Sequence, residues 1–237
     1  MKSTDDIAVI IQARLGSQRV PAKMLRDFAG STLLDIALEK LKHSTVFPKE
    51  NVFLCVHEPE LAVVGKRHGV NVFWRSAISA SSEGDPLMEL YEWWDRLPYR
   101  YGVLVNACLP FLSTGTIDAF VRQYAATKAD GLFGVIERRN YFWDENHRLL
   151  CDLPGDRAVM NTKSVGVTYE AAHALYAGRL DRIGEGVWMG DLRRPGEIEL
   201  FPIAEEEALD IDYPWQFEMA ESLYNRRYGG SQHELVR

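Results

Sequence analysis

The sequence is poor in cysteine, in long apolar runs and in positive charge. Its three cysteines, Cys55, Cys108 and Cys151, are odd in number, lie far apart and lack metal spacing. Neither a disulfide framework nor a cysteine-based metal site is therefore expected, and we interpret all three as inert thiols, with Cys55 and Cys108 buried in the core. No apolar run reaches membrane-spanning length, and the polar N-terminus is unlike a signal peptide. We expect a cytoplasmic protein without a membrane partner.

The net charge of −7 over 237 residues argues against nucleic-acid binding, which needs a broad basic surface to neutralise phosphates. Hydrophobic residues make up 46% of the chain and charged residues 26%, as in ordinary globular proteins. The length suffices for one sizeable core, and we expect a single domain over residues 1–237. A local cluster of cations in such an acidic chain would therefore indicate a small anionic ligand.

Apolar, β-rich segments alternate with helical patterns along most of the chain. The expected strands are residues 7–11, 51–56, 71–75, 101–107, 131–136 and 197–203, and the expected helices are 31–43, 59–69, 85–97, 114–127, 168–184 and 213–229. This alternation predicts an α/β fold with a doubly wound, mostly parallel sheet. Ligands of such sheets bind beyond the carboxyl ends of the strands, so the residues that follow each strand are candidates for a site.

Residues 138–165 interrupt the alternation with a polar, aromatic and turn-rich segment. The segment could be a small antiparallel excursion, a lid over the site or a dimerisation element. Its aromatic residues, Tyr141, Phe142 and Trp143, could form an interface, although a local core is an equally good interpretation.

The segment from Gln12 to Leu25 carries the first functional motif. The expected first strand ends at Gln12, and the loop that follows contains three cations, Arg14, Arg19 and Lys23. A basic loop at the end of a buried strand commonly binds phosphate, because backbone N–H groups and cationic side chains converge there on a rigid support. The alternative for Arg19 and Lys23 is that they are solvated surface charges, as most Lys and Arg residues are.

The second motif is ALDIDYP, residues 208–214. In an extended segment alternate side chains point the same way, so Asp210 and Asp212 should share one side while Ile211 packs inward. Paired carboxylates suit Mg²⁺, which is typically held by one or two carboxylates together with substrate phosphates. The alternative is a solvated turn in which Asp212 caps the last helix. Together with a phosphate-binding loop, the metal interpretation is favoured.

These motifs resemble those of the cytidylyltransferases that make CMP-activated acidic sugars. That group includes acylneuraminate and 3-deoxy-octulosonate cytidylyltransferases and a relative implicated in spore-coat polysaccharide synthesis. The phosphate-loop pattern A-R-x-x-S-x-(R/G)-x-P-x-K is matched by Ala13, Arg14, Ser17, Arg19, Pro21 and Lys23. The D-I-D before a proline resembles the metal-binding end of the family, and residues 105–111, VNACLPF, resemble its Pro-containing sugar loop.

Two departures from the family pattern concern the acceptor. The octulosonate branch has an acidic metal ligand after the fourth strand, where this chain has Asn106, Ala107 and Cys108. The sialate branch usually has an arginine in the sugar loop, where this chain has Leu112. The resemblance thus indicates the class of enzyme without its acceptor.

The resemblance implies a fold like that of nucleotide-diphospho-sugar transferases and an Mg²⁺-dependent enzyme. An oxygen of a small acidic acceptor would attack the α-phosphate of CTP and release pyrophosphate. A 2-keto sugar acid such as a sialic acid is the expected acceptor. A non-sugar acid such as a phosphonate is the alternative, and a non-catalytic nucleotide-binding protein is a second alternative. A homodimer is also implied, and no nucleic-acid partner.

The resemblance also implies roles for individual residues. The expected catalytic residues are Arg14, Lys23 and Asp212; the expected substrate-binding residues are Ala13, Gly16, Ser17, Arg19, Arg75, Ser82 and Asn106; and Asp210 and Asp212 are the expected metal ligands. Arg75 and Ser82 would read the base and ribose, and Asn106 would contact the acceptor or the base. No histidine is expected to act as a base, because His57, His68 and His147 show no partner spacing.

Overall fold

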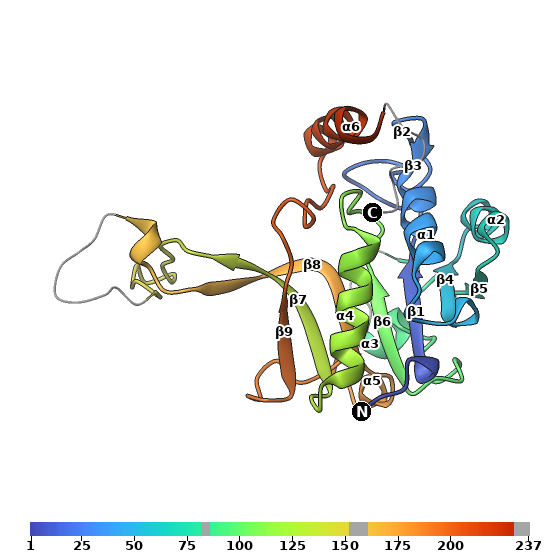
Figure 1. Ribbon diagram of the computed structural model, residues 1–237. Helices are drawn as coiled ribbons and strands as arrows, with labels where there is room; N and C mark the ends of the chain where they lie inside the picture. The colour runs from blue at the N-terminus through green and yellow to red at the C-terminus, as the bar shows by residue number, and fades with distance from the viewer. Residues whose placement is uncertain (82–85, 152–160, 230–237) are drawn as a thin grey trace.

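The computed structural model describes residues 1–81, 86–151 and 161–229 and is built around one seven-stranded sheet (Figure 1). Its strands are β1 (Ile7–Gln12), β4 (Val52–Val56), β5 (Asn71–Trp74), β6 (Tyr101–Val105), β7 (Gly131–Arg138), β8 (Thr168–Arg179) and β9 (Ile198–Pro202), in the order β5-β4-β1-β6-β8-β7-β9. Only β8 among these strands runs antiparallel to its neighbours. The prediction of an α/β fold with a mostly parallel sheet is confirmed.

Helices surround this sheet, and short 3₁₀ turns and a two-stranded ribbon lie in the connections. The helices are α1 (Leu33–His43), α2 (Pro59–His68), α3 (Leu87–Leu90), α4 (Thr114–Ala126), α5 (Asp181–Gly184) and α6 (Pro214–Tyr228). The 3₁₀ turns are η1 (Thr4–Asp6), η2 (Lys49–Asn51) and η3 (Thr162–Ser164), and the ribbon pairs β2 (Asp27–Phe28) with β3 (Ser31–Thr32). No helix of the described residues is long and apolar enough to cross a membrane.

The two faces of the sheet pack into two separate cores because side chains alternate along β1. Ile7, Val9 and Ile11 belong to the larger core, with the apolar faces of α1 and α4, whereas Ala8 and Ile10 belong to a smaller core behind the sheet. Helix α1 begins where the Thr32 hydroxyl accepts a hydrogen bond from the Asp35 N–H, as its capping preference predicts. The sheet is therefore buried on both faces, and its strand ends are left for the site.

The prediction of a helix over residues 168–184 was wrong. This segment is strand β8, followed by the short helix α5. Strand β8 pairs with β6 along one edge and with β7 along the other, so its backbone groups are satisfied within the sheet. Because helix propensity is a weak preference, these two partners outweigh the helix-favouring alanines of the sequence.

The helix expected over residues 85–97 is also much shorter in the structure. Helix α3 covers only Leu87–Leu90, and turns follow it. Trp93 in those turns is fully buried, and its indole N–H donates to the side-chain oxygen of Gln12 at 2.8 Å. The chain leaves the helical path because this large ring packs into the smaller core beside β1.

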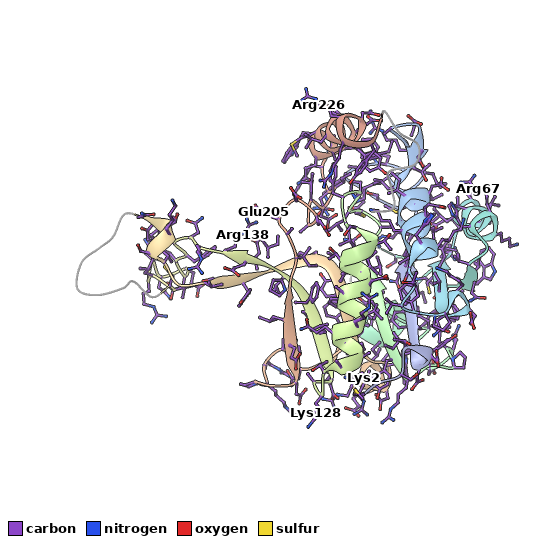
Figure 2. The ribbon with its side chains drawn as sticks, in the orientation of Figure 1. Lys2, Arg67, Lys128, Arg138, Glu205 and Arg226 are labelled. Carbon is purple, nitrogen blue, oxygen red and sulfur yellow. The ribbon has the colours of Figure 1, made fainter. Side chains whose placement is uncertain are left out.

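Strands β7 and β8 extend beyond the body of the sheet as a twisted two-stranded arm that projects to the left in Figure 1. Arg138 lies at the base of this arm, where its guanidinium pairs with Glu170 at 2.6 Å and also with Glu205 (Figure 2). Near the tip, Trp143 and Leu149 form an isolated antiparallel bridge. In the described residues 138–151 and 161–165, the segment that interrupts the sequence pattern therefore contains antiparallel pairing.

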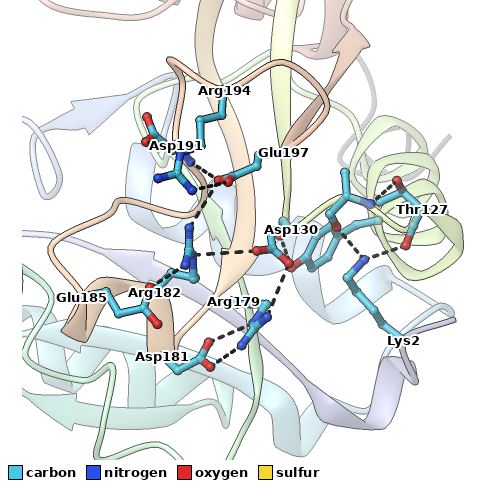
Figure 3. Close-up of polar contacts among 12 residues, drawn as sticks. Lys2, Thr127, Asp130, Arg179, Asp181, Arg182, Glu185, Asp191, Arg194 and Glu197 are labelled. Carbon is cyan, nitrogen blue, oxygen red and sulfur yellow. Dashed lines mark hydrogen bonds and ion pairs between the residues drawn. The ribbon is translucent and has the colours of Figure 1, made fainter.

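A polar network closes the sheet at the end where β1 begins (Figure 3). The Lys2 ammonium donates to the carbonyls of Thr127 at 2.7 Å and Ala129 at 2.9 Å. Asp130 lies beside two arginines of β8 and α5, Arg179 at 3.6 Å and Arg182 at 3.7 Å. These contacts fix the N-terminus and the start of β7 at one end of the sheet, opposite the carboxyl ends of the parallel strands.

Close packing at Gly178 generates a test of the fold. A Cβ atom at Gly178 would lie 2.3 Å from the Cα of Met189, whereas nothing lies within 4 Å of a Cβ at Gly166, near the start of the same strand. We expect Gly178→Ala to lower the free energy of unfolding by about 1–3 kcal/mol through overpacking, and Gly166→Ala to change it by less than about 0.5 kcal/mol. Urea unfolding measures both; equal midpoints would contradict the position of β8 against Met189.

Candidate functional site

Two adjoining pockets open at the carboxyl ends of the central strands. The loop pocket, of about 430 Å³, is lined by Ala13, Arg14, Gly16, Ser17, Arg19, Lys23, Cys108 and Asp212, among others. The inner pocket, of about 470 Å³, is lined by residues that include Arg14, Arg75, Tyr91, Asn106, His173, Tyr176, Trp188, Asp210 and Asp212. Gln12, Arg14 and Asp212 line both pockets. All of the expected site residues that the structure describes therefore converge, and Ser82 lies outside the described residues.

The loop after β1 is held from several directions. The side chain of Gln12 accepts the Trp93 indole N–H at 2.8 Å and donates to the Leu90 carbonyl at 3.4 Å. The backbone N–H of Leu15 donates to a carboxylate oxygen of Glu58 at 2.8 Å, and the Arg14 guanidinium donates to the carbonyl of Ser81. The loop therefore has a fixed path from the strand end into the site, as a pre-organised phosphate-binding loop requires.

Arg19 and Lys23 are paired with the C-terminal motif. Asp212 lies 2.8 Å from the Arg19 guanidinium and 3.6 Å from the Lys23 ammonium. Lys23 is buried and also donates to the backbone carbonyl of Ile211. The hydrogen bond that Arg19 donates to the Tyr213 side chain and the negative charge of Asp212 raise the pKa of Arg19. Neither cation is simply a solvated loop charge, since both contact the residues 211–213.

Asp210 occupies a more enclosed position than Asp212. One of its oxygens accepts a hydrogen bond from the Asn106 amide at 3.3 Å, and the other is buried without a hydrogen-bond partner. Burial and the neighbouring charge of Asp212 raise the pKa of Asp210. Ile211 between the two is completely buried, so the two carboxylates lie on the pocket side of an extended segment.

Asp212 does not cap helix α6. The side-chain oxygen of Gln216 accepts the backbone N–H of Asp212 at 2.7 Å and that of Tyr213 at 2.8 Å. The carboxylate of Asp212 faces the loop cations instead. The capping alternative for this residue is therefore wrong.

The donor set suits a hard divalent cation. Asp210 and Asp212 offer carboxylate oxygens, one of which is buried and unpartnered, and hard oxygen ligands are those that Mg²⁺ prefers. Among residues 1–81, 86–151 and 161–229, no group of three or more His, Cys, Asp or Glu side chains is arranged to hold a metal ion. A metal at this pair would thus need oxygens from a bound phosphate or from water to complete its coordination.

The inner pocket contains a group of residues that the sequence did not suggest. Tyr91, Tyr176 and Trp188 form an aromatic wall, with ring centroids 4.7 Å apart for Tyr176 and Trp188 and 6.2 Å for the stacked rings of Tyr91 and Trp188. The indole N–H of Trp188 is buried without a hydrogen-bond partner. An unpaired donor on an apolar wall is suited to a ligand that is apolar on one face and carries hydroxyl groups.

His173 projects into this pocket from an irregularity in β8. Its φ of 51° lies in the left-handed region, and the pairing of β7 with β8 shifts register beside it; such bulges commonly re-aim a side chain near an active site. Its Nδ1 lies 2.6 Å from the Tyr176 hydroxyl, and its carbonyl accepts the Asn106 amide at 2.8 Å. The expectation that no histidine acts as a base was argued from His57, His68 and His147, and none of these three lines either pocket. It did not consider His173.

Because residues 168–184 were predicted to form a helix, His173 and Tyr176 were not identified from the sequence as pocket residues. A helix would have presented these residues to solvent or to another helix rather than to the ends of β6 and β1. The available signal in the sequence was the alternation of the apolar Ala172 and Ala174 with the polar His173; in the structure the two alanines are buried and His173 is exposed.

Cys55 is a buried core thiol as expected, but the same interpretation of Cys108 was wrong. Cys108 is only partly buried and lines the loop pocket. Burial raises the pKa of its thiol to about 11, so the protonated form prevails at neutral pH. Its side chain contributes to the wall of the pocket and is a poor nucleophile there.

Three solved structures share the fold of this chain. The chain is similar to a CMP:2-keto-3-deoxy-manno-octonic acid synthetase complexed with CTP, with a TM-score of 0.68 and 13% identity over 94% of this chain and 100% of that one. It is also similar to a cytidylyltransferase from Leptospira borgpetersenii, with a TM-score of 0.62, 18% identity and coverage of 94% and 87%. A third similar structure is a 4-diphosphocytidyl-2C-methyl-D-erythritol synthase from Anaerococcus prevotii, with a TM-score of 0.65 and 12% identity over 94% of this chain and 97% of that one. At these identities the likeness shows the fold.

The chain belongs to the cytidylyltransferase family, whose model matches residues 8–232. It is also similar to the spore coat polysaccharide biosynthesis protein SpsF of Bacillus subtilis, with 33% identity over 73 residues. That similarity spans 30% of each of the two chains.

The enclosure of Asp210 generates a prediction about stability. Because its pKa is raised in the folded state, the charged carboxylate opposes folding at pH 7. We expect Asp210→Asn to raise the urea midpoint at pH 7 without added metal, and the gain to shrink as the pH falls through the folded-state pKa towards the ordinary aspartate value. Asp212→Asn is the matched control, which should give no gain because it removes ion pairs to Arg19 and Lys23. A lower midpoint for Asp210→Asn at pH 7 would contradict the prediction.

Proposed function

We propose that the protein transfers CMP from CTP to an oxygen of an acidic sugar and releases pyrophosphate. The observation that carries this proposal is the meeting of three loop cations with two carboxylates, in a chain that belongs to the cytidylyltransferase family. Transfer of this kind depends on positioning and charge neutralisation rather than on a covalent intermediate with the protein.

The loop pocket would take the triphosphate. Arg14, Arg19 and Lys23 would neutralise its oxygens, Ser17 would donate its hydroxyl, and the small Ala13 and Gly16 would allow close approach of the backbone. Gly16 supports this role because a side chain there would meet nothing within 4 Å, so the space beside it is open. Asp212 forms ion pairs with Arg19 and Lys23. A bound triphosphate would compete with Asp212 for these two cations.

Asp210 and Asp212 would hold Mg²⁺ together with phosphate oxygens. When bound there, Mg²⁺ neutralises charge on the phosphates and lowers the proton affinity of a coordinated acceptor oxygen. Asp212 becomes available for this role once the phosphates engage Arg19 and Lys23. The unpartnered oxygen of Asp210 supports the same role, since a buried acceptor without a partner is costly.

The inner pocket would take the nucleoside and the acceptor. Arg75 is buried, donates to Ser79 at 2.9 Å through Nε and lines the pocket; we assign it to the base or ribose. Ser82 stays a prediction for the same role. Asn106 and the missed residues His173 and Trp188 would contact the acceptor, with the aromatic wall against the apolar face of a sugar ring.

The acidity of the acceptor is supported by relatives rather than by the pocket itself. The similar structure is a synthetase for an activated 2-keto sugar acid, and SpsF is a polysaccharide biosynthesis protein. A phosphonate acceptor is the alternative, because Asn106 and Leu112 stand where family branches have charged residues. Nucleotide binding without turnover is the second alternative. The natural setting that we propose for this activity is the cytoplasm, where CTP is available.

Pyrophosphate release tests the function directly. With CTP, Mg²⁺ and a panel of 2-keto sugar acids and phosphonates, we expect turnover with CTP and a sugar acid, and at least about tenfold less with UTP, ATP or GTP. A thermal shift with CTP but no pyrophosphate from any acceptor would support the non-catalytic alternative, and turnover only with phosphonates would exclude the sugar acid. No shift and no turnover would overturn the proposal.

Asp212→Asn is the control variant for this assay. It should abolish turnover, because it removes a proposed metal ligand, while CTP binding in the presence of EDTA should tighten, because Arg19 and Lys23 lose their competing partner. Normal turnover by this variant would remove the metal assignment. Loss of CTP binding together with a lowered unfolding midpoint would instead indicate a folding defect.

We further propose that the protein is a homodimer joined through the tip of the arm. Trp143 and Leu150 at the tip are 59% and 65% exposed, and Tyr169 on the arm is also exposed; clustered exposed apolar side chains commonly mark interaction sites. We expect sedimentation at micromolar concentration to give a dimer, and the double variant Trp143→Ser, Leu150→Ser to give a folded monomer. A monodisperse wild-type monomer would contradict this assignment.

A further inference from the structure

Lys40 is a buried cation of helix α1 that lines neither pocket. Its side chain is enclosed, with 8% of the residue exposed, and its ammonium donates to the carbonyls of Leu109 at 3.1 Å and Pro110 at 2.6 Å. No carboxylate of the described chain lies within ion-pair distance of it, although the charge of Glu207 is near enough to act on it. Burial lowers the pKa of Lys40 to about 7. A charged group buried at such cost needs an explanation beyond packing.

The two carbonyls that Lys40 holds belong to the loop between β6 and α4, residues 106–112. The same loop supplies Asn106, whose amide contacts Asp210 and whose side-chain oxygen accepts the Cys108 N–H at 2.9 Å. The loop also contacts residues 210–212, because the Cys108 carbonyl accepts the Ile211 N–H at 3.2 Å. The path of residues 106–112 therefore sets where Asp210 and Asp212 lie.

We propose that Lys40 is a positioning residue for the transfer reaction, which clamps the loop 106–112 from beneath and thereby holds Asp210 and Asp212 in place. The inference rests on the proposed function of this carboxylate pair. Lys40 lies outside both pockets and acts through the loop. Its ammonium binds the carbonyls of Leu109 and Pro110, the carbonyl of the adjacent Cys108 accepts the Ile211 N–H, and Ile211 lies between the two carboxylate residues.

The geometry distinguishes this role from simple stabilisation of the core. An apolar side chain could fill the same space, but both carbonyls would lose the donor that they share, and the Leu109 carbonyl would keep only the Leu112 N–H, at 3.3 Å. A lysine places one charged donor group on both carbonyls at once, which fixes the orientation of two successive peptide groups. The Thr114 hydroxyl also donates to the Lys40 carbonyl at 3.1 Å, so α1 and the start of α4 hold the loop between them.

Lys2 provides a matched control. Its ammonium likewise bridges two carbonyls, of Thr127 and Ala129, as Figure 3 shows. Those carbonyls follow the last turn of α4, whereas the carbonyls held by Lys40 precede its first turn. Removing either ammonium therefore deletes the same kind of clamp, at the two opposite ends of one helix, and only one of these ends adjoins the proposed site.

The experiment compares Lys40→Met with Lys2→Met in the full-length protein. We expect Lys40→Met to lower kcat by about 10- to 100-fold, as misplacement of reacting groups by a distant change can do, while the KM for CTP stays within about twofold. The Mg²⁺ concentration for half-maximal activity should rise. In hydrogen exchange, the Ile211 amide should lose protection in Lys40→Met and keep it in Lys2→Met, which should also keep the kinetic constants of the wild type.

Wild-type kcat and wild-type protection of the Ile211 amide in Lys40→Met would overturn the inference, and so would equal losses in the two variants. If Lys40→Met does not fold, Lys40→Gln replaces it, since its shorter amide reaches one carbonyl in place of two; an unchanged kcat and unchanged exchange at Ile211 would again be decisive. A wild-type protein without turnover would instead refute the proposed function, and the exchange comparison would still decide whether Lys40 holds Ile211.

Discussion

The ion pairs of Asp212 with Arg19 and Lys23 join two segments that stand almost a whole chain apart, since Lys23 and Ile211 are separated by 188 residues. Both segments carry like charges that would repel within themselves, three cations in one and two carboxylates in the other. Bringing them together offsets part of this repulsion through the ion pairs of Asp212, and it gathers the groups that we propose bind a polyanion and a divalent cation. The same contact explains why the loop after β1 has a defined path and why α6 returns to the carboxyl ends of the strands.

The sheet makes this contact possible. With one core on each face, the strands are fixed in position and direction, and β1 and β6 end side by side. The loops that follow these two strands therefore begin side by side. The polar network of Figure 3 lies at the other end of the same strands. One end of the sheet is therefore closed by ion pairs of Asp130 with Arg179 and Arg182, and the other end carries the ion pairs of Asp212 with Arg19 and Lys23, which line the pockets.

Most of the fold and part of the candidate site were predictable, because they depend on local patterns. The cations of the loop and the Asp210–Asp212 pair are set by residues a few positions apart, and the structure has them where the pattern predicts. The rest depends on distant partners. Strand β8 is a strand because β6 and β7 flank it, and α3 stops because Trp93 binds Gln12. The group of His173, Tyr176 and Trp188 in the inner pocket depends on such distant partners, so no local pattern contains it.

Strand β8 belongs at once to the arm and to the wall of the inner pocket. It runs from Thr168 in the arm to Arg179 in the sheet, with His173 between them. Side chains alternate with a period of two, so inserting or deleting one residue between Thr168 and His173 would turn the arm residues to the opposite face relative to the pocket. A change of length along this stretch is therefore expected to disturb the inner pocket, because the root of the arm is tied to the geometry of that pocket.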